Sequence, residues 1–205
     1  MVEKAGVGRL LERAGALASR RWRGLVWLSG EAGDCRRAAL ALWQAGGWQA
    51  PLWVAPAPPP GLPEGACLAP GRARTRLGGE QDLLVVDAVS DGAGFDPDAF
   101  GALAGTLRAG GLLVLMTPPD WGARPDADYA RLAEHPFLPE RLSARYLARL
   151  ARLLGDAPEV IRWRAGEAPL LPPLCEAAPA VLAPAGDPDC LTDDQAEAVA
   201  RLVGQ

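Results

Sequence analysis

The sequence has very few residues of the types that most nucleophilic and phosphate-binding enzymes need. Lys4 is the only lysine and His135 the only histidine among 205 residues. Beyond the N-terminus no lysine can complete a Gly-Lys-Ser/Thr phosphate loop or form a Schiff base. A nucleophile activated by histidine would depend on His135, which precedes Pro136 in a segment typical of a surface loop. The sequence therefore indicates no catalytic residue.

Cysteines and long apolar segments are scarce as well. The four cysteines, Cys35, Cys67, Cys175 and Cys190, include no pair at the close spacing of zinc sites, so no metal site is predicted and free thiols are expected. No apolar run is long enough to span a bilayer, and the N-terminal segment lacks the apolar centre of a signal peptide. We therefore expect a cytoplasmic protein with no membrane partner.

A net positive charge is also missing, because the formal charge at pH 7 is -4. Any contact with nucleic acid must then depend on a local basic patch. The candidate patch is a set of arginines at helical spacing, namely Arg141, Arg145, Arg149 and Arg152. Arginine can bind one phosphate through two hydrogen bonds, so this set is a candidate RNA contact; a solvated helix face is the alternative. Two smaller clusters, in residues 20–23 and 72–76, would extend the patch if they lay on the same side.

What the chain does contain is a strand-helix-strand unit between residues 78 and 119. Its two strands, residues 83–87 and 112–116, are continuously apolar, as in parallel sheets covered by helices on both faces. A parallel pair needs a crossover connection, and the helix between these strands supplies a compact one.

Local signals define that helix. Asp96 is predicted to cap it, with its carboxylate accepting hydrogen bonds from free backbone amides, and Pro97 suits the first helical position. Phe95 and Phe100 lie where a hydrophobic staple would place them. Gly110 is predicted to end the helix in a left-handed conformation.

Helical and strand patterns alternate along the rest of the chain. Helices are predicted over about residues 2–20, 35–44 and 138–154, strands over residues 24–28, 51–54 and 159–163, and a loop over residues 56–70. This alternation predicts an α/β fold with a mainly parallel sheet of about five strands.

The C-terminal part of the sequence differs in composition. Residues 169–190 are rich in proline and alanine and are predicted to be a linker after a domain of residues 1–168. Residues 191–205 begin with the capping box Thr192-Asp193-Asp194-Gln195 and continue with helical periodicity. Such a helix either starts a following domain, truncated at residue 205, or docks back on the first domain.

Tests for nucleotide-binding motifs leave few candidates. The exit of the first strand, residues 29–34, contains glycines but no lysine, which favours a plain strand-to-helix turn over an anion site. Residues 107–115 resemble the late strand entry of methyltransferases that use S-adenosylmethionine, so such an enzyme is a second hypothesis. Asp87 ends a buried strand, where functional groups are frequent, but it also suits capping of the next loop. No cofactor-binding residue is predicted.

Several blocks, in their order and spacing, resemble one known family. They are Val26-Trp27-Leu28-Ser29-Gly30-Glu31, Leu77-Gly78-Gly79-Glu80, Val86-Asp87-Ala88, the long block from Gly94 to Leu115, Pro125-Asp126-Ala127-Asp128 and Thr192-Asp193-Asp194-Gln195. The chain is similar to the N-terminal domain of bacterial tRNA(Met) cytidine acetyltransferases, the TmcA family. The resemblance implies a Rossmann-like three-layer fold in a multidomain parent, with a helicase-like module that uses ATP and an acetyltransferase domain that uses acetyl-CoA.

The resemblance further implies that the parent enzyme N4-acetylates the wobble cytidine of elongator tRNA(Met). This chain stops before the family's ATP-binding loop, so residues 191–205 would start the helicase-like domain, and no catalytic or cofactor-binding residue is carried over. We therefore predict a non-catalytic module whose partners are the downstream helicase-like and acetyltransferase domains and tRNA. The alternatives are the methyltransferase-like enzyme and a purely structural interaction domain.

Overall fold

The structure, a computed structural model, describes residues 2–174. Within them the chain forms a six-stranded sheet in the order β3-β2-β4-β5-β1-β6, and every neighbouring pair is parallel. The strands are β1 (Gly24–Ser29), β2 (Pro51–Val54), β3 (Cys67–Leu68), β4 (Gln81–Asp87), β5 (Leu107–Thr117) and β6 (Ile161–Arg164). The predicted α/β fold with a mainly parallel sheet is confirmed, with one strand more than the sequence indicated.

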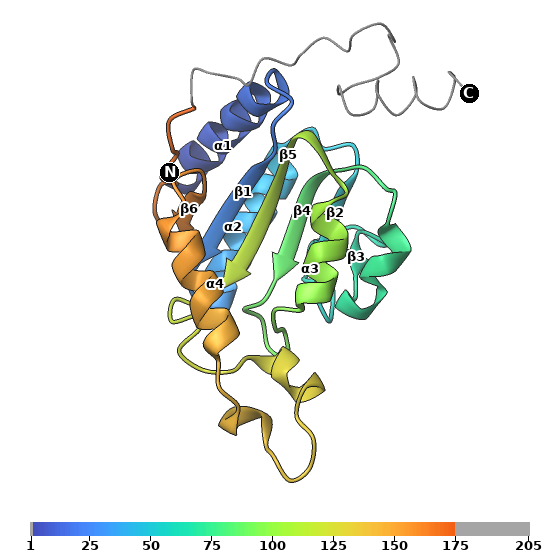
Figure 1. The fold of residues 1–205 in the computed structure, drawn as a ribbon. Coiled ribbons are helices and arrows are strands. Elements are labelled where there is room, and N and C mark those ends of the chain that lie inside the picture. The colour runs from blue at the N-terminus through green and yellow to red at the C-terminus, as the bar shows by residue number, and fades with distance from the viewer. Residues whose placement is uncertain (1, 175–205) are drawn as a thin grey trace, which may run out of the picture. The chain divides into compact units, whose positions relative to one another are not determined.

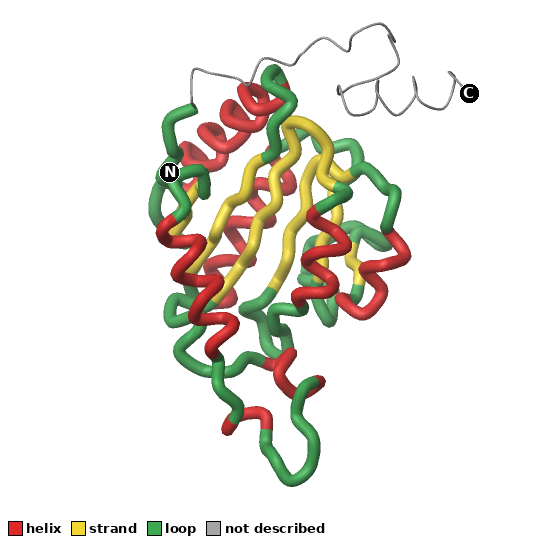
Figure 2. The backbone as a smooth tube through the Cα atoms, viewed as in Figure 1, coloured by secondary structure: helices red, strands yellow, loops and turns green. Residues whose placement is uncertain are grey.

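Helices cover both faces of the sheet and give the expected three layers (Figure 1). α1 (Val2–Ala18) and α2 (Ala32–Ala45) lie on one face, and α3 (Pro97–Ala104) and α4 (Arg145–Asp156) lie on the other. Because β4 is covered on both sides, every residue of this strand is buried, which explains its continuous apolar run. Figure 2 shows a long, mostly irregular excursion between β5 and α4, beyond the carboxyl ends of the strands.

The connections that leave β1 and β5 run in opposite directions across the sheet. From β1 the chain passes through α2 to β2, beyond β5 and β4, whereas from β5 it passes through α4 to β6, beyond β1. β1 and β5 are nevertheless direct neighbours, with Ser29 opposite Thr117 at their carboxyl ends. Open α/β sheets bind ligands at such a switch point, outside the carboxyl ends of the strands.

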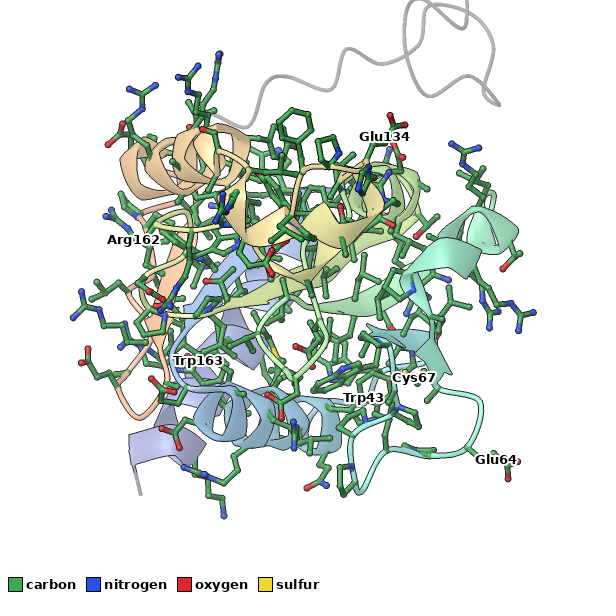
Figure 3. The ribbon with its side chains drawn as sticks, turned by 90° about the horizontal axis from the view of Figure 1, so that it is seen from below. Trp43, Glu64, Cys67, Glu134, Arg162 and Trp163 are labelled. Atoms are coloured by element: carbon green, nitrogen blue, oxygen red, sulfur yellow. The ribbon has the colours of Figure 1, made fainter. Side chains whose placement is uncertain are left out.

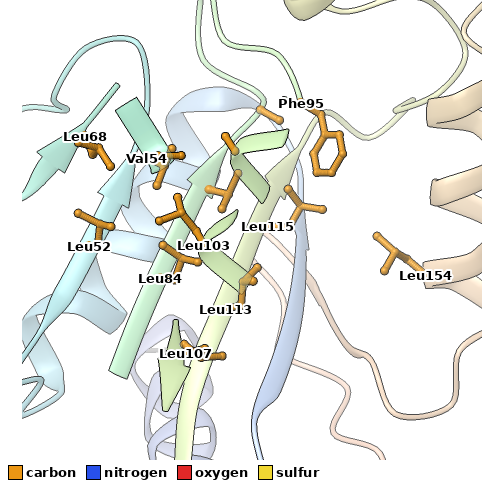
Figure 4. Close-up of a cluster of buried hydrophobic side chains, with 14 of the residues drawn as sticks. Leu52, Val54, Leu68, Leu84, Phe95, Leu103, Leu107, Leu113, Leu115 and Leu154 are labelled. Carbon is orange, nitrogen blue, oxygen red and sulfur yellow. The ribbon is translucent and has the colours of Figure 1, made fainter. Parts of the chain in front are cut away.

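The core between the sheet and α3 is built mainly from leucines (Figure 4). Leu84 of β4, Leu113 of β5 and Leu103 of α3 are all buried in one cluster, which also includes Leu154 of α4. Each fully buried leucine contributes roughly 1.5–3 kcal/mol relative to an exposed one. This cluster therefore fixes the positions of both helices on that face.

The predicted N-terminus of α3 is confirmed. The Asp96 carboxylate accepts hydrogen bonds from the amides of Asp98 and Ala99, at 2.9 and 3.0 Å. The rings of Phe95 and Phe100 lie 5.2 Å apart, as a hydrophobic staple requires. These signals act between residues that are close in the sequence, so they could be recognised without the fold.

The predicted C-terminus of α3 is wrong. The helix ends at Ala104, and Gly110 lies inside β5 with a φ of 79°. A Cβ added at Gly110 would meet the Ala18 side chain of α1 at 2.6 Å. The glycine therefore serves a close approach between β5 and α1, and not the end of a helix.

Two other predictions need correction. The helix expected from residue 138 is a short 3-10 helix, Pro139–Arg141, followed by α4 from Arg145. In a continuous helix Leu142 would lie on the outer face; the break lets it pack against the core instead. The loop expected over residues 56–70 contains β3, which extends the sheet beside β2.

The predicted C-terminal elements fall largely outside the described residues. The helix over residues 191–205 lies wholly outside them, and the linker over residues 169–190 is described only up to residue 174. In that part, the amide and carbonyl of Leu170 pair with those of Arg162 in β6. The first residues after β6 are therefore attached to the edge of the sheet.

Candidate nucleic-acid interface

α4 buries one face against the sheet and turns the other to solvent. Leu147 and Leu154, two turns apart, are 1% and 8% exposed, and Leu150 packs against the same core. At the start of the helix, the ring of Tyr146 lies 6.3 Å from that of Phe95. These contacts fix the rotation of the helix about its axis and so decide which residues face outward.

The structure brings three of the four predicted arginines together on that outer face. Arg145, Arg149 and Arg152 are exposed and lie opposite the buried leucines of α4, with about one turn between neighbours. Arg141 is exposed too, but it lies in the 3-10 helix Pro139–Arg141 that precedes α4. Within residues 4–174, none of these four side chains forms an ion pair.

Several other arginines are held by carboxylates of the same domain. Arg108 donates to Asp82 at 2.9 Å, and Arg131 donates to Asp128 at 2.9 Å. The hydrogen bond from Arg131 to Asp128 raises the pKa of Arg131 above its usual value. Such pairs use the positive charge inside the domain, whereas the arginines of α4 leave theirs available to an external anion.

The two smaller arginine clusters do not extend the face of α4. Residues 20–23 follow α1 at the amino end of β1, where the Arg20 guanidinium stands 6.0 Å from the Trp22 ring. Residues 72–76 belong to the 3-10 helix Pro70–Arg76, which packs beside α3 at the opposite edge of the sheet from α4 (Figure 1). The three clusters are therefore separate surfaces.

Two arginines on the edge strand β6 were not among the residues predicted for an interface. Arg162 and Arg164 alternate with the buried Ile161 and Trp163, so both arginines lie on the face of the sheet that α4 covers. Figure 3 shows Arg162 and Trp163 on opposite sides of the strand, Arg162 toward α4 and Trp163 toward α2. The available signal was the alternation of charged and apolar residues, which distinguishes this edge strand from the buried central strands.

Two candidates from the sequence have structural roles. Asp87 is 3% exposed, and its carboxylate accepts hydrogen bonds from the amides of Val89 and Ser90 and from the Ser90 hydroxyl, at 2.7 to 3.1 Å. At the exit of β1, a Cβ added at Gly30 would meet Ala165 at 2.8 Å. Asp87 therefore caps its loop, and packing against the chain after β6 accounts for the glycine at the exit of β1.

One side chain joins two of the blocks that carry the family resemblance. The Asp126 carboxylate accepts hydrogen bonds from the amide of Phe95 at 2.7 Å and from that of Asp128 at 3.2 Å. A Cβ added at Gly94 would meet the Asp128 amide nitrogen at 2.2 Å, so the two segments can approach this closely only at a glycine. Burial raises the pKa of Asp126 above its usual 3.8, although both amide hydrogen bonds oppose the rise. These contacts hold the segments around Gly94 and Asp126 against each other.

The described residues contain few groups suited to bond-making chemistry. Within residues 4–174, no three His, Cys, Asp or Glu side chains are grouped so that they could hold a metal ion. Burial raises the pKa of the Cys35 thiol to about 12 and also raises that of Cys67, so both thiols are protonated at neutral pH. In this part of the chain no helix has the length and apolar character needed to cross a membrane.

Comparison with known proteins identifies the family. Residues 3–165 match the family described as tRNA(Met) cytidine acetyltransferase TmcA, N-terminal. A protein named tRNA(Met) cytidine acetyltransferase TmcA from Nitrosococcus halophilus is 38% identical over 199 residues, covering 93% of this chain and 25% of the relative. Proteins of the same name from Yersinia pestis and Citrobacter koseri are 35% and 39% identical, covering 91% and 69% of this chain but 25% and 20% of the relatives.

The chain thus spans about a quarter of the length of the first two of these relatives. The family match covers the sheet and all four α-helices that the described residues form, from α1 to β6. The N-terminal domain expected from the blocks in the sequence is therefore confirmed. The chain belongs to the TmcA family of tRNA(Met) cytidine acetyltransferases, as its N-terminal domain.

Proposed function

We propose that this chain is a non-catalytic module of a tRNA(Met) cytidine acetyltransferase and that it contacts tRNA through the outer face of α4. The proposal rests on Arg145, Arg149 and Arg152, which are exposed on one helix face and form no ion pair within residues 4–174. Each guanidinium can donate two hydrogen bonds to a phosphate. Because phosphate contacts carry no base information, this face would position tRNA without selecting its sequence.

In this proposal the chemistry belongs to other parts of the parent protein. The relatives are named as tRNA(Met) cytidine acetyltransferases, and the chain spans about a quarter of their length. The parent would N4-acetylate the wobble cytidine of elongator tRNA(Met), with acetyl-CoA and ATP bound by its acetyltransferase and helicase-like domains. The chain's net charge of -4 fits an auxiliary contact, since attraction for RNA would be local to one face.

A contact with the helicase-like domain is favoured by apolar side chains on the excursion between β5 and α4. Leu132, Phe137 and Leu138 are 56%, 66% and 53% exposed. The excursion extends beyond the carboxyl ends of the strands, where a neighbouring domain could reach it (Figure 1). Large apolar side chains exposed on one segment are commonly covered by a partner, so we propose that the helicase-like domain covers these three residues in the parent.

The tRNA contact is tested by titrating this chain with a tRNA(Met) transcript at low salt. The triple variant Arg145→Gln, Arg149→Gln, Arg152→Gln is expected to bind at least about tenfold more weakly, because it loses three phosphate contacts. The matched control is Arg72→Gln, Arg74→Gln, Arg76→Gln, which removes the same charge at the opposite edge of the sheet and should bind like wild type. An equal loss in both variants would show that only net charge matters and would reject the α4 face.

The domain contact is tested by expressing this chain and the rest of the parent protein separately, mixing the two, and measuring their association. Phe137→Ser with Leu138→Ser should weaken association, since it removes two large apolar side chains from the proposed surface. Leu77→Ser is the control, because Leu77 is 61% exposed at the amino ends of the strands. Unchanged association in the double variant would contradict the docking proposal, while leaving the tRNA contact to its own test.

A further inference from the structure

A hollow of about 740 Å³ lies between β1, β6 and the end of α4. Its lining includes Trp27 and Ser29 of β1, Pro119 after β5, Gly155 of α4, and Arg162 and Arg164 of β6. We call it the β6 hollow. It opens at the carboxyl ends of β1 and β5, the point from which the chain's connections run in opposite directions, and its size matches that of small-molecule sites.

Two arginines of β6, Arg162 and Arg164, line the β6 hollow. Arg162 and Arg164 are two residues apart on one strand, so both lie on the same face with their Cα atoms roughly 6.5 Å apart. They stand beside Trp27 and Ser29, respectively, in the parallel register of β1 and β6. Glu167 also lines the hollow, but within residues 4–174 neither arginine forms an ion pair with any carboxylate. Two guanidinium groups on one face of a strand can together bind the several oxygens of a phosphate group.

Part of the lining of the hollow is the Trp27 indole, whose orientation is fixed by two neighbouring side chains. The Trp27 indole N–H donates a hydrogen bond to the Thr117 hydroxyl at 2.9 Å, which fixes the orientation of the ring. The Trp121 ring supports it from one side, with the two ring centroids 6.4 Å apart. Trp27 is only partly buried, and it lines the hollow. An indole held in this way offers a surface on which a nucleobase can stack.

We propose that the β6 hollow binds a nucleotide, with the 5′-phosphate between Arg162 and Arg164 and the base against Trp27. The nucleotide is either a free nucleoside monophosphate or the 5′-phosphorylated end of an RNA strand, since both present the same groups. This site is separate from the outer face of α4, whose arginines lie on the solvent side of that helix. The two proposals can therefore fail independently.

The test is a titration of this chain with AMP, followed through the NMR signal of the Trp27 indole N–H, which the variant Trp27→Phe assigns. AMP should shift that signal at lower concentration than either adenosine or inorganic phosphate, because only AMP carries both groups. In Arg162→Gln with Arg164→Gln the AMP dissociation constant should rise about tenfold or more, because two charge-assisted contacts are lost.

The matched control is Arg72→Gln with Arg74→Gln, which removes the same charge at the opposite edge of the sheet and should leave AMP binding unchanged. Both β6 arginines are exposed on an edge strand, so the double variant should fold; the single variant Arg164→Gln serves if it does not. Two outcomes would overturn the proposal. One is the absence of any Trp27 shift with millimolar AMP, and the other is equal AMP affinity in wild type and the β6 variants.

The source of the nucleotide is distinguished by comparing AMP with a short single-stranded RNA, with and without a 5′-phosphate. Tighter binding of the phosphorylated RNA than of AMP, lost in the Arg162 and Arg164 variant, assigns the hollow to an RNA end. Binding of AMP that equals or exceeds that of the phosphorylated RNA assigns it to a free nucleotide. If removing the 5′-phosphate changes neither the RNA affinity nor the Trp27 shift while AMP still binds, an RNA end is rejected and the hollow is assigned to a free nucleotide.

Discussion

Charged residues have different roles around α3 and on α4, the two helices that cover one face of the sheet. Around α3, Asp96 caps the helix, Asp126 holds the segment before it, and Arg131 is paired with Asp128. On α4, Arg145 and Arg149 are exposed and form no ion pair within the described part of the chain. The charged side chains around α3 bind other groups of the same fold, whereas the arginines of α4 remain available to a partner.

This difference separates the residues that identify the family from those that can act on a partner. The family blocks around Gly94 and Asp126 are explained by close packing and by capping hydrogen bonds, without any ligand. The arginines of α4 and β6 contribute little to packing, so the fold does not account for them. Substitutions in the first region should change stability, and those in the second should change binding.

The largest loss of stability is expected for Phe95→Ala. Phe95 is 2% exposed and its ring lies 5.2 Å from that of Phe100 and 5.5 Å from that of Trp121. Removing this ring should lower the free energy of unfolding by about 3–5 kcal/mol, measured by urea denaturation. Phe137→Ala is the control, because Phe137 is 66% exposed and should cost about 0.5 kcal/mol or less. A loss below about 1 kcal/mol for Phe95→Ala would show that Phe95 does not hold this region together.

A smaller loss is expected for Asp126→Ala. The substitution leaves the Phe95 and Asp128 amides without their acceptor and should cost about 1–3 kcal/mol in the free energy of unfolding. Asp120→Ala is the matched control, since Asp120 forms an exposed ion pair with Arg124 that is worth at most about 1 kcal/mol. Equal effects of the two substitutions would mean that Asp126 is no more important than a surface carboxylate.

The contribution of Asp126 to stability should depend on pH, and the direction of its pKa shift fixes the sign of that dependence. Burial raises the pKa of Asp126 in the folded chain above the usual 3.8, so the folded state binds more protons than the unfolded state between the two pKa values. The stability of wild type relative to Asp126→Asn should therefore fall as the pH rises through this interval, measured by urea denaturation at a series of pH values. A relative stability that rises with pH would show that the two amide hydrogen bonds outweigh burial.

The smallest change in stability is expected for Arg149→Ala. Its side chain is exposed, it forms no ion pair in the described part of the chain, and alanine favours helix. The free energy of unfolding should stay within about 0.5 kcal/mol of wild type, measured by thermal or urea denaturation. A loss of 2 kcal/mol or more, roughly the effect of a core substitution, would show that Arg149 serves the fold and would remove the contrast between the two regions.

How much could be predicted from the sequence depends on how far apart the interacting residues are. The cap at Asp96 and the staple between Phe95 and Phe100 involve near neighbours, and both were predicted correctly. Gly110 was misassigned because its role depends on Ala18 of α1, which is far away in the sequence. Local patterns define the ends of helices well only where the partner is also local.

The candidate surfaces show the same limit. The helical spacing of the α4 arginines could be read from the sequence, and three of the four lie on one helix face, but their lack of ion pairs depends on where every carboxylate lies. The arginines of β6 went unnoticed because the β6 hollow exists only through the strand order, which places β6 beside β1. No local sequence motif around Arg162 or Arg164 indicates that β6 lies beside β1.

The central claim, that the outer face of α4 binds RNA phosphates, is tested most directly by the salt dependence of tRNA binding. The logarithm of the association constant should fall linearly with the logarithm of salt concentration, with a slope proportional to the number of phosphates contacted. Replacing Arg145, Arg149 and Arg152 by glutamine should reduce that slope by about two to three, and replacing Arg72, Arg74 and Arg76 should leave it unchanged. Equal slopes for wild type and the α4 variant would contradict the account.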